Sequence, residues 1–355
     1  MNKKNADIQV ERVYPEHFQI IEEAIKYIDS PSFLGYHSPA YMNLLTKVLA
    51  DNPLYLVAYS NDKIAGFLPL RWRSGSLGPV INGLPFFGPN GGPIFTRSDT
   101  IETGTILNAL FTALTELAED LGAVSVVLYT PFLADPAPIK KVFKPDRVVE
   151  KFTQYIELAN RPIQWPTRSR RAVQRAKKWG CQVRPGTAED IPALLQIYHE
   201  NCEAADILVK PDEYLYQAVN HLCPAGIARF TVAEWESKIV ACLITLQGVG
   251  TVSYNVPCSR IQDRTLQANS LLVDEAVHYF QGGGYKYWNW EASPSREHPV
   301  YEFKNHWGSQ EASYQTLIRH PRGFSIFSNV SPREIAASYQ FYFVVPFDDL
   351  EKSHE

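Results

Sequence analysis

Apolar residues along the chain change between helical spacing and short continuous runs, and the order of these patterns occurs twice. In the first half, a helical pattern precedes two apolar runs separated by a turn of Ser, Asn and Asp, which is typical of a β-hairpin. A segment rich in glycine and proline follows, and then a long amphipathic pattern. The predicted elements are a helix over 38–49, strands over 54–59 and 64–70, an irregular loop over 75–93, a helix over 107–121 and a strand over 124–129.

The second half repeats this order. Its predicted elements are strands over 230–235, 239–246 and 251–256, a polar loop over 259–264, a helix over 271–280, a glycine stop at 282–284 and a strand over 285–291. We interpret the repetition as an internal duplication. The alternative is chance recurrence of a common hairpin. A last apolar run predicts a strand over 339–345.

The bulk composition predicts a soluble protein of roughly two domains. The chain has 355 residues, 45% of them hydrophobic and 20% charged, with a net charge of −4. This charge argues against a protein coated in nucleic acid, so any such contact needs a local basic patch. Five cysteines without a C-x-x-C pair indicate reduced thiols and a cytoplasmic protein. The polar N-terminus and the lack of a long apolar run predict neither a signal peptide nor a membrane span.

One local basic patch is present between the two halves. Pro166 and Gly180 are typical start and stop signals for a helix. Within it, Arg168, Arg171 and Arg175 recur every three or four residues and therefore share one face. Such a face favours a phosphate-bearing partner. The alternative is a solvated face paired with acidic neighbours.

Four stretches together resemble a known family. They read RSRRAVQRAKKWG from 168, VRPGTAEDIPALLQIYHE from 183, ANSLLVDEAVHYFQGGGYKYWNWE from 268 and YEFKNHWG from 301. The chain resembles the FemAB-like branch of the GNAT acyltransferase superfamily, which includes acetyltransferases of the CelD/BcsL type. The resemblance implies an α/β fold with mixed sheets. It also implies tandem GNAT-like domains, 1–160 and 161–355, each a mostly antiparallel sheet flanked by helices.

The resemblance also implies an activity. The expected reaction is transfer of an acyl or aminoacyl group to the amine of a small-molecule or lipid-linked acceptor, for example a cell-envelope precursor. Acyl-CoA or aminoacyl-tRNA is the implied co-substrate, and no tightly bound cofactor is expected. The GNAT pyrophosphate loop carries glycine where this chain has Asp263. A carboxylate there repels phosphate, and the departure favours the branch that uses aminoacyl-tRNA.

Three residues are candidates for catalysis. Lys304 follows Phe303 in a pair that resembles a family motif at the transfer site; the alternative is an exposed strand lysine. Glu291, which alternation places on the same strand face as Asn289, is a candidate base or a carboxylate paired with a lysine. Tyr254 is a candidate to orient the acyl carbonyl, or else a core tyrosine.

The candidate donor-binding or phosphate-binding residues come from two segments. They are Arg260, Arg264 and Asn269 near the polar loop, with Arg168, Arg171 and Arg175 of the basic helix. Asn269 is most simply explained as a helix N-cap. The histidines show no metal-ligand spacing, so no metal site is predicted. A different class of function also stays open, a catalytically silent GNAT-fold module that binds a phosphorylated ligand or RNA. The sequence predicts no oligomeric state.

Overall fold

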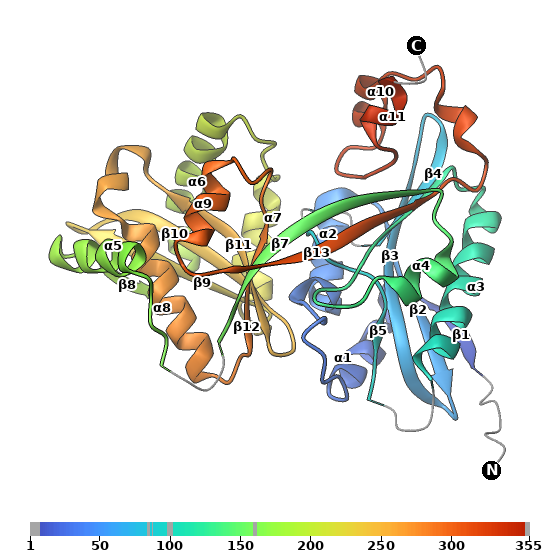
Figure 1. Ribbon diagram of the computed structural model, residues 1–355, viewed down its shortest axis with the longest axis horizontal. Coiled ribbons are helices and arrows are strands. Elements are labelled where there is room, and N and C mark those ends of the chain that lie inside the picture. The colour runs from blue at the N-terminus through green and yellow to red at the C-terminus, as the bar shows by residue number, and fades with distance from the viewer. Residues whose placement is uncertain (1–7, 84–85, 87, 98–101, 159–161, 352–355) are drawn as a thin grey trace. The chain divides into compact units, whose positions relative to one another are not determined.

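The computed structural model describes residues 8–83, 86, 88–97, 102–158 and 162–351. These residues pack into two compact units. Unit 1 consists of Met1–Pro39, Leu49–Lys151 and Ser313–Glu355, and unit 2 consists of Ala40–Val48 and Phe152–Ala312. Figure 1 labels their helices and strands.

The predicted boundary between residues 160 and 161 lies outside the described residues. The two units do not correspond to a single cut at that point, because each is made of more than one segment of the chain. The C-terminal segment belongs to unit 1 because its apolar residues are buried there. Phe327, Ile335 and Tyr339 pack in one hydrophobic cluster with Val80 and Val124. Burial of apolar surface therefore places the end of the chain with its beginning.

The sheet of unit 1 is mostly antiparallel. Its strands are β1 (Gln9–Val13), β2 (Asn52–Ser60), β3 (Lys63–Gly75), β4 (Gly78–Asn82), β6 (Ser125–Tyr129) and residues 313–319 of β13 (Gln310–Arg319), in that spatial order, with β5 (Ile94–Phe95) beside β3. Only β4 and β6 pair in parallel among the strand pairs described in this unit. The sheet carries α1 (Gln19–Ile25), α3 (Thr103–Leu121), α4 (Ala137–Phe143), α10 (Pro332–Ser338) and α11 (Phe347–Glu351).

Helix α3 forms because its apolar residues recur at helical spacing. Leu107, Leu110, Leu114 and Leu117 are buried against the sheet. Gly122 ends the helix in a left-handed conformation, with φ of 64°. The sequence therefore determines both the length of this helix and the face that it buries.

The sheet of unit 2 has the same plan. Its strands are residues 152–157 of β7 (Arg147–Glu157), β12 (Tyr287–Ala292), β11 (Thr251–Ser259), β10 (Lys238–Gln247), β9 (Ala228–Trp235) and β8 (Gln182–Pro185), in that spatial order. Here β11 and β12 form the parallel pair. The helices are α2 (Pro39–Leu49, through residues 40–48), α5 (Thr167–Lys178), α6 (Ile191–Ala205), α7 (Asp212–Gln217), α8 (Ala268–Gly282) and α9 (Pro299–Asn305).

The two units therefore share one order of elements. In unit 1 the hairpin β2–β3 leads through β4 and α3 to β6, which is parallel to β4. In unit 2 the hairpin β9–β10 leads through β11 and α8 to β12, which is parallel to β11. The mixed sheets flanked by helices confirm the fold class that the sequence predicted.

Three local predictions were wrong. The segment 75–93 is not irregular throughout, because β4 lies inside it and pairs with β3 and β6. The loop over 259–264 is mostly a 3₁₀ helix, Ile261–Leu266. The segment 339–345 is not a strand: Tyr339, Val344 and Val345 are buried, but they pack in a loop, so an apolar run indicated burial without indicating its form.

Candidate active site in unit 2

The candidate site lies where the parallel strands β11 and β12 part. The two strands pair only from Thr251 to Ser253 on one side and from Tyr287 to Asn289 on the other. Beyond Asn289 the register of β12 relative to its other neighbour, β7, shifts. Where two strands part, the polar side chains at their ends are no longer covered by a neighbouring strand.

Glu291 sits at this register shift in an uncommon conformation. Its φ of 66° lies in the left-handed region, which costs a residue other than glycine on the order of 1–3 kcal/mol. Its main-chain N–H donates to Oδ1 of Asn289 at 3.0 Å, and its Oε1 accepts from Nδ2 of Asn289 at 3.4 Å. The residue is 9% exposed. The fold therefore holds a carboxylate inside the unit at the cost of backbone strain.

Lys304 reaches the same point from helix α9. It is only 2% exposed, and its Nζ donates to the main-chain carbonyl oxygens of Glu291 at 3.1 Å and Ala292 at 2.7 Å. Burial lowers the pKa of Lys304 to about 7, although the Glu291 carboxylate opposes this shift. The alternative of an exposed strand lysine does not hold, because the residue is buried and helical.

An ammonium group has three N–H donors, and a neutral amine has two. The two carbonyl oxygens of Glu291 and Ala292 take two donors of Lys304. The charged form therefore keeps one N–H for a substrate oxygen, and the neutral form presents a lone pair instead. With a pKa of about 7, both forms are populated near neutral pH.

A second buried lysine, Lys210, was missed by the sequence reasoning. It lies between α6 and α7, and burial lowers its pKa to about 8, against the attraction of the Glu291 carboxylate. Its Nζ is 5.6 Å from the ring centroid of Tyr214. The hydroxyl of Tyr214 donates to Oδ1 of Asn255 at 2.8 Å. The available signal was a lysine directly after the apolar run Ile207–Val209, which is too general to identify a site.

The structure does not place Tyr254 in this polar group. Tyr254 is 6% exposed and packs in the core with Trp288 and Trp290, at ring-centroid distances of 5.8 and 4.9 Å. Alternation along β11 and β12 puts these three rings on the sheet face opposite to Asn255 and Asn289. Burial raises the pKa of Tyr254. The core-tyrosine alternative therefore agrees better with its surroundings.

Asn269 is not an N-cap, because α8 begins at Ala268 and Gln267 precedes it. Its Nδ2 donates instead to the hydroxyl of Tyr254 at 3.0 Å. The Asn269 amide is therefore a hydrogen-bond partner of the buried Tyr254 hydroxyl. Gln267, with a φ of 60°, forms the turn into the helix.

The guanidinium of Arg260 is held by the fold itself. Its Nε donates to the carbonyl oxygen of Ile239 at 3.0 Å and its Nη2 to Oε1 of Gln196 at 3.3 Å, and Nη1 lies 3.6 Å from Glu200. Arg264 is exposed and makes no ion pair with a residue that the structure describes. Of the two arginines beside the predicted donor loop, only Arg264 is available to an external phosphate.

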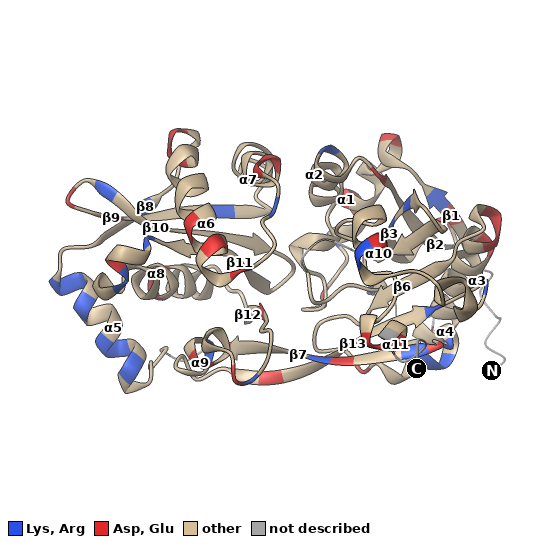
Figure 2. Ribbon diagram, turned by 90° about the horizontal axis from the view of Figure 1, so that it is seen from above, with Lys and Arg blue, Asp and Glu red and all other residues tan. Residues whose placement is uncertain are grey.

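The basic helix is confirmed as α5, and Figure 2 shows lysine and arginine along its length. Its opposite face packs on the unit, because Ser169, Val173 and Ala176 are buried. Arg171 and Arg175 are exposed and form no ion pair within the described part of the chain. Arg168 pairs with Glu302 at 3.2 Å, but both side chains are more than half exposed, so the pair contributes little to stability.

Helix α5 is also attached to the helix that carries Lys304. The hydroxyl of Ser169 donates to the carbonyl oxygen of His306 at 2.5 Å, just after α9. The exposed arginine face of α5 therefore belongs to a helix that is hydrogen-bonded to the end of α9.

Two negative findings concern only the described ranges. There, no group of three or more His, Cys, Asp or Glu side chains is placed to hold a metal ion. No helix in those ranges combines the length and apolar character that crossing a membrane requires.

The sequence matches no family model and no curated protein sequence. Solved structures do match. FemX is 10% identical, with a TM-score of 0.66 over 86% of this chain and 96% of that one. L-PGS from Bacillus licheniformis is 13% identical, with a TM-score of 0.55 over 85% and 91%. A tandem GNAT protein from the clavulanic acid biosynthesis pathway is 11% identical, with a TM-score of 0.54 over 89% and 99%. The chain therefore has the tandem GNAT fold, and the resemblance to the FemAB-like branch is confirmed at the level of the fold.

Proposed function

We propose that this chain is an N-acyltransferase that forms an amide on an amine acceptor, with its transfer site in unit 2. The observation that carries the proposal is the burial of Lys304 and Lys210 around the carboxylate of Glu291, where the parallel strands of a GNAT sheet part. Perturbed lysines facing a strained carboxylate are typical of a catalytic site rather than of a packing core.

The proposed reaction begins with attack by the acceptor nitrogen on the carbonyl carbon of the donor ester or thioester. A C–N bond forms, and the π electron pair of the carbonyl moves onto its oxygen. The third N–H of charged Lys304 donates to this oxyanion. Glu291 takes the proton that the attacking nitrogen loses.

Collapse of the intermediate breaks the bond to the leaving oxygen or sulfur. Lys210, with a pKa of about 8, is mostly charged at neutral pH and gives a proton to the leaving group. Glu291 then returns its proton to Lys210, so the site regains its starting protonation state. The amide, the deacylated donor and the unchanged protein are the products.

The donor is an aminoacyl-tRNA in this proposal. Arg171 and Arg175 present exposed, unpaired charge within the described residues, which suits a polyphosphate chain. The loop that would hold the pyrophosphate of acyl-CoA has Asp263 in a 3₁₀ helix, and Arg260 there is engaged with the fold. The acceptor is an amine of a small-molecule or lipid-linked cell-envelope precursor, and the compartment is the cytoplasm, where charged tRNA is present.

The deciding experiment incubates the chain with amine-bearing envelope precursors and either total aminoacyl-tRNA or acetyl-CoA. Mass spectrometry then detects the amide. We expect product with aminoacyl-tRNA and loss of product in Lys304→Met. Product only with acetyl-CoA would refute the tRNA donor but keep the transferase. Saturable tRNA binding without product from any acceptor would favour the alternative, a silent module for a phosphorylated ligand or RNA.

A further inference from the structure

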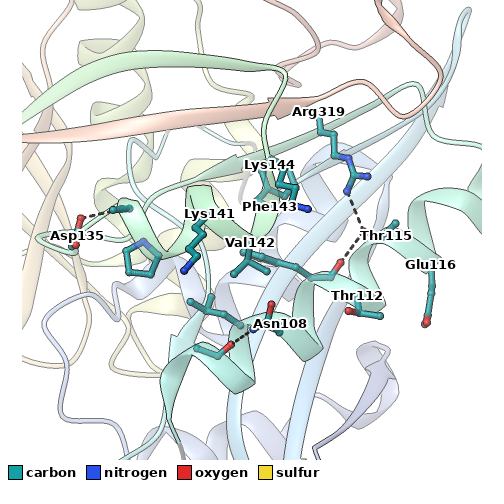
Figure 3. Close-up of a pocket in the computed structure, with 15 residues that line it drawn as sticks. Asn108, Thr112, Thr115, Glu116, Asp135, Lys141, Val142, Phe143, Lys144 and Arg319 are labelled. Carbon is teal, nitrogen blue, oxygen red and sulfur yellow. Dashed lines mark hydrogen bonds between the residues drawn. The ribbon is translucent and has the colours of Figure 1, made fainter.

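Unit 1 contains a groove that the proposed reaction does not use. The groove lies between α3 and α4, has a volume of about 800 Å³ and is open to solvent (Figure 3). This volume is within the usual range for small-molecule sites, roughly 300–1,000 Å³. A smaller cavity of about 100 Å³ shares Thr115, Phe143 and Arg319 with it and extends the groove to Glu119.

The groove is long because it follows one face of a helix. Its α3 lining recurs at each turn, from Gly104 through Asn108 and Thr112 to Glu116. At 1.5 Å per residue, the stretch from Gly104 to Glu119 is roughly 22 Å long. An elongated ligand fits this shape better than a compact one.

The floor of the groove is apolar. Leu107, Phe111 and Phe143 line it, each at most 4% exposed. The rings of Phe111 and Phe143 meet edge to face at 5.7 Å, and Val142 lies beside them. This floor offers hydrocarbon contact and no charge.

The rim carries more positive than negative charge. Lys141 and Lys144 are exposed and form no ion pair with a described residue, and Arg319 donates to Oγ1 of Thr115 at 3.2 Å. Two carboxylates also line the groove, Glu116 and Asp135. Asp135 already accepts from the main-chain N–H of Ala137 at 2.9 Å, at the start of α4.

We propose that this groove binds one amphipathic anion, a linear apolar chain that ends in a carboxylate or phosphate. The chain lies on Leu107, Phe111 and Phe143, and the anionic end meets Lys141, Lys144 and Arg319. A groove walled by two helices admits a single chain and excludes a bilayer, so the ligand is a free molecule with one such chain, and not a lipid held in a membrane. The site is in unit 1 and is independent of the transfer chemistry in unit 2.

The test is calorimetric titration of the full chain with dodecanoate below its micelle concentration. We expect saturable binding at one site, and a loss of at least tenfold in affinity in the double variant Lys141→Glu with Lys144→Glu. Lys140→Glu is the matched control, because Lys140 is on the same helix but does not line the groove. We expect it to stay within about twofold of the parent. Dodecyltrimethylammonium, with the same tail and opposite charge, should not bind.

A second variant tests the groove without changing charge. A Cβ at Gly104 meets no atom within 4 Å, so Gly104→Leu fills open space at the end of the groove. Leucine is also a better helix former than glycine, so the fold should be kept. We expect weaker dodecanoate binding, whereas Thr105→Leu, an exposed residue outside the lining, should leave it unchanged.

Three results would overturn the site. The first is dodecanoate affinity that neither the charge variant nor Gly104→Leu changes, and the second is equal affinity for the cationic detergent. The third is recruitment to phosphatidylglycerol vesicles through Lys141 and Lys144 with no dodecanoate binding, which would mean membrane docking instead.

Discussion

The side-chain nitrogen of Lys304 lies 3.1 Å from the main-chain carbonyl oxygen of Glu291, so a helix lysine is bonded to the one strand residue of β12 that has a positive φ. The bond ties the position of the amine to the register shift in the sheet. One irregularity, the register shift in β12, therefore determines where both the Lys304 amine and the Glu291 carboxylate lie.

Loss of the Lys304 amine should slow transfer. We expect Lys304→Met to lower kcat by about 10²–10³, the effect of removing one oxyanion donor. Lys304→Arg should keep part of the activity. Because arginine stays charged, the fall in rate should move from about pH 7 to about pH 8, where Lys210 loses its proton. A pH–rate profile of the three proteins measures this. Equal profiles for the parent and Lys304→Arg would contradict the assigned role.

The same lysine predicts a pH dependence of stability. Its pKa is lowered to about 7 in the folded state, so above pH 7 the unfolded chain binds more protons and the free energy of unfolding rises with pH. Between pH 7 and 9 the contribution is about 2 kcal/mol. Urea titrations should show that Lys304→Met lacks this contribution and keeps only the part of the rise that comes from Lys210, whose pKa is also lowered, to about 8. Lys238→Met, at an exposed position at the start of β10, is the control and should keep the full rise.

Glu291 should control both buried lysines. Its carboxylate raises the pKa of Lys304 and of Lys210, against the effect of burial. Glu291→Gln removes that charge, so any alkaline limb of the pH–rate profile should move to lower pH while the maximal rate falls. An unshifted limb would show that the carboxylate does not act on the titrating lysine.

The α5 face should bind RNA through charge. We expect Arg171→Glu with Arg175→Glu to weaken tRNA binding and to reduce the slope of log affinity against log salt concentration by about two. Filter binding at several salt concentrations measures this slope. Lys238→Glu, a charge reversal of an exposed residue at the start of β10, should change neither value. The proposal for this helix fails if the double variant keeps the parental slope.

A buried ion pair should be a major contributor to the stability of unit 1. The guanidinium of Arg71 and the carboxylate of Asp51 are both fully buried, and Asp51 also accepts from the hydroxyl of Tyr342 at 2.5 Å. Asp51→Ala leaves the Arg71 charge without its partner, and we expect a loss of about 3–5 kcal/mol in urea unfolding. Glu119→Ala, at an exposed position of α3, should cost less than about 0.5 kcal/mol.

The sequence alone determined the elements with strong periodicity. The leucine stripe of α3, the glycine at its end and the exposed arginines of α5 are local properties, because helical spacing and capping depend only on nearby residues. The two hairpins and the repeated order of elements were also readable. These features predicted the duplication, whereas the fold class was implied by the resemblance to the FemAB-like branch.

Only the tertiary structure decided which polar residues lie together. Tyr254 was a candidate to orient the acyl carbonyl, but its ring packs with Trp288 and Trp290 on the opposite sheet face. Lys210 joined the site from a loop without periodicity, and Arg260 left it by bonding to the fold. The reason is physical: burial and charge pairing depend on residues far apart in the chain, and no local pattern records which of them meet.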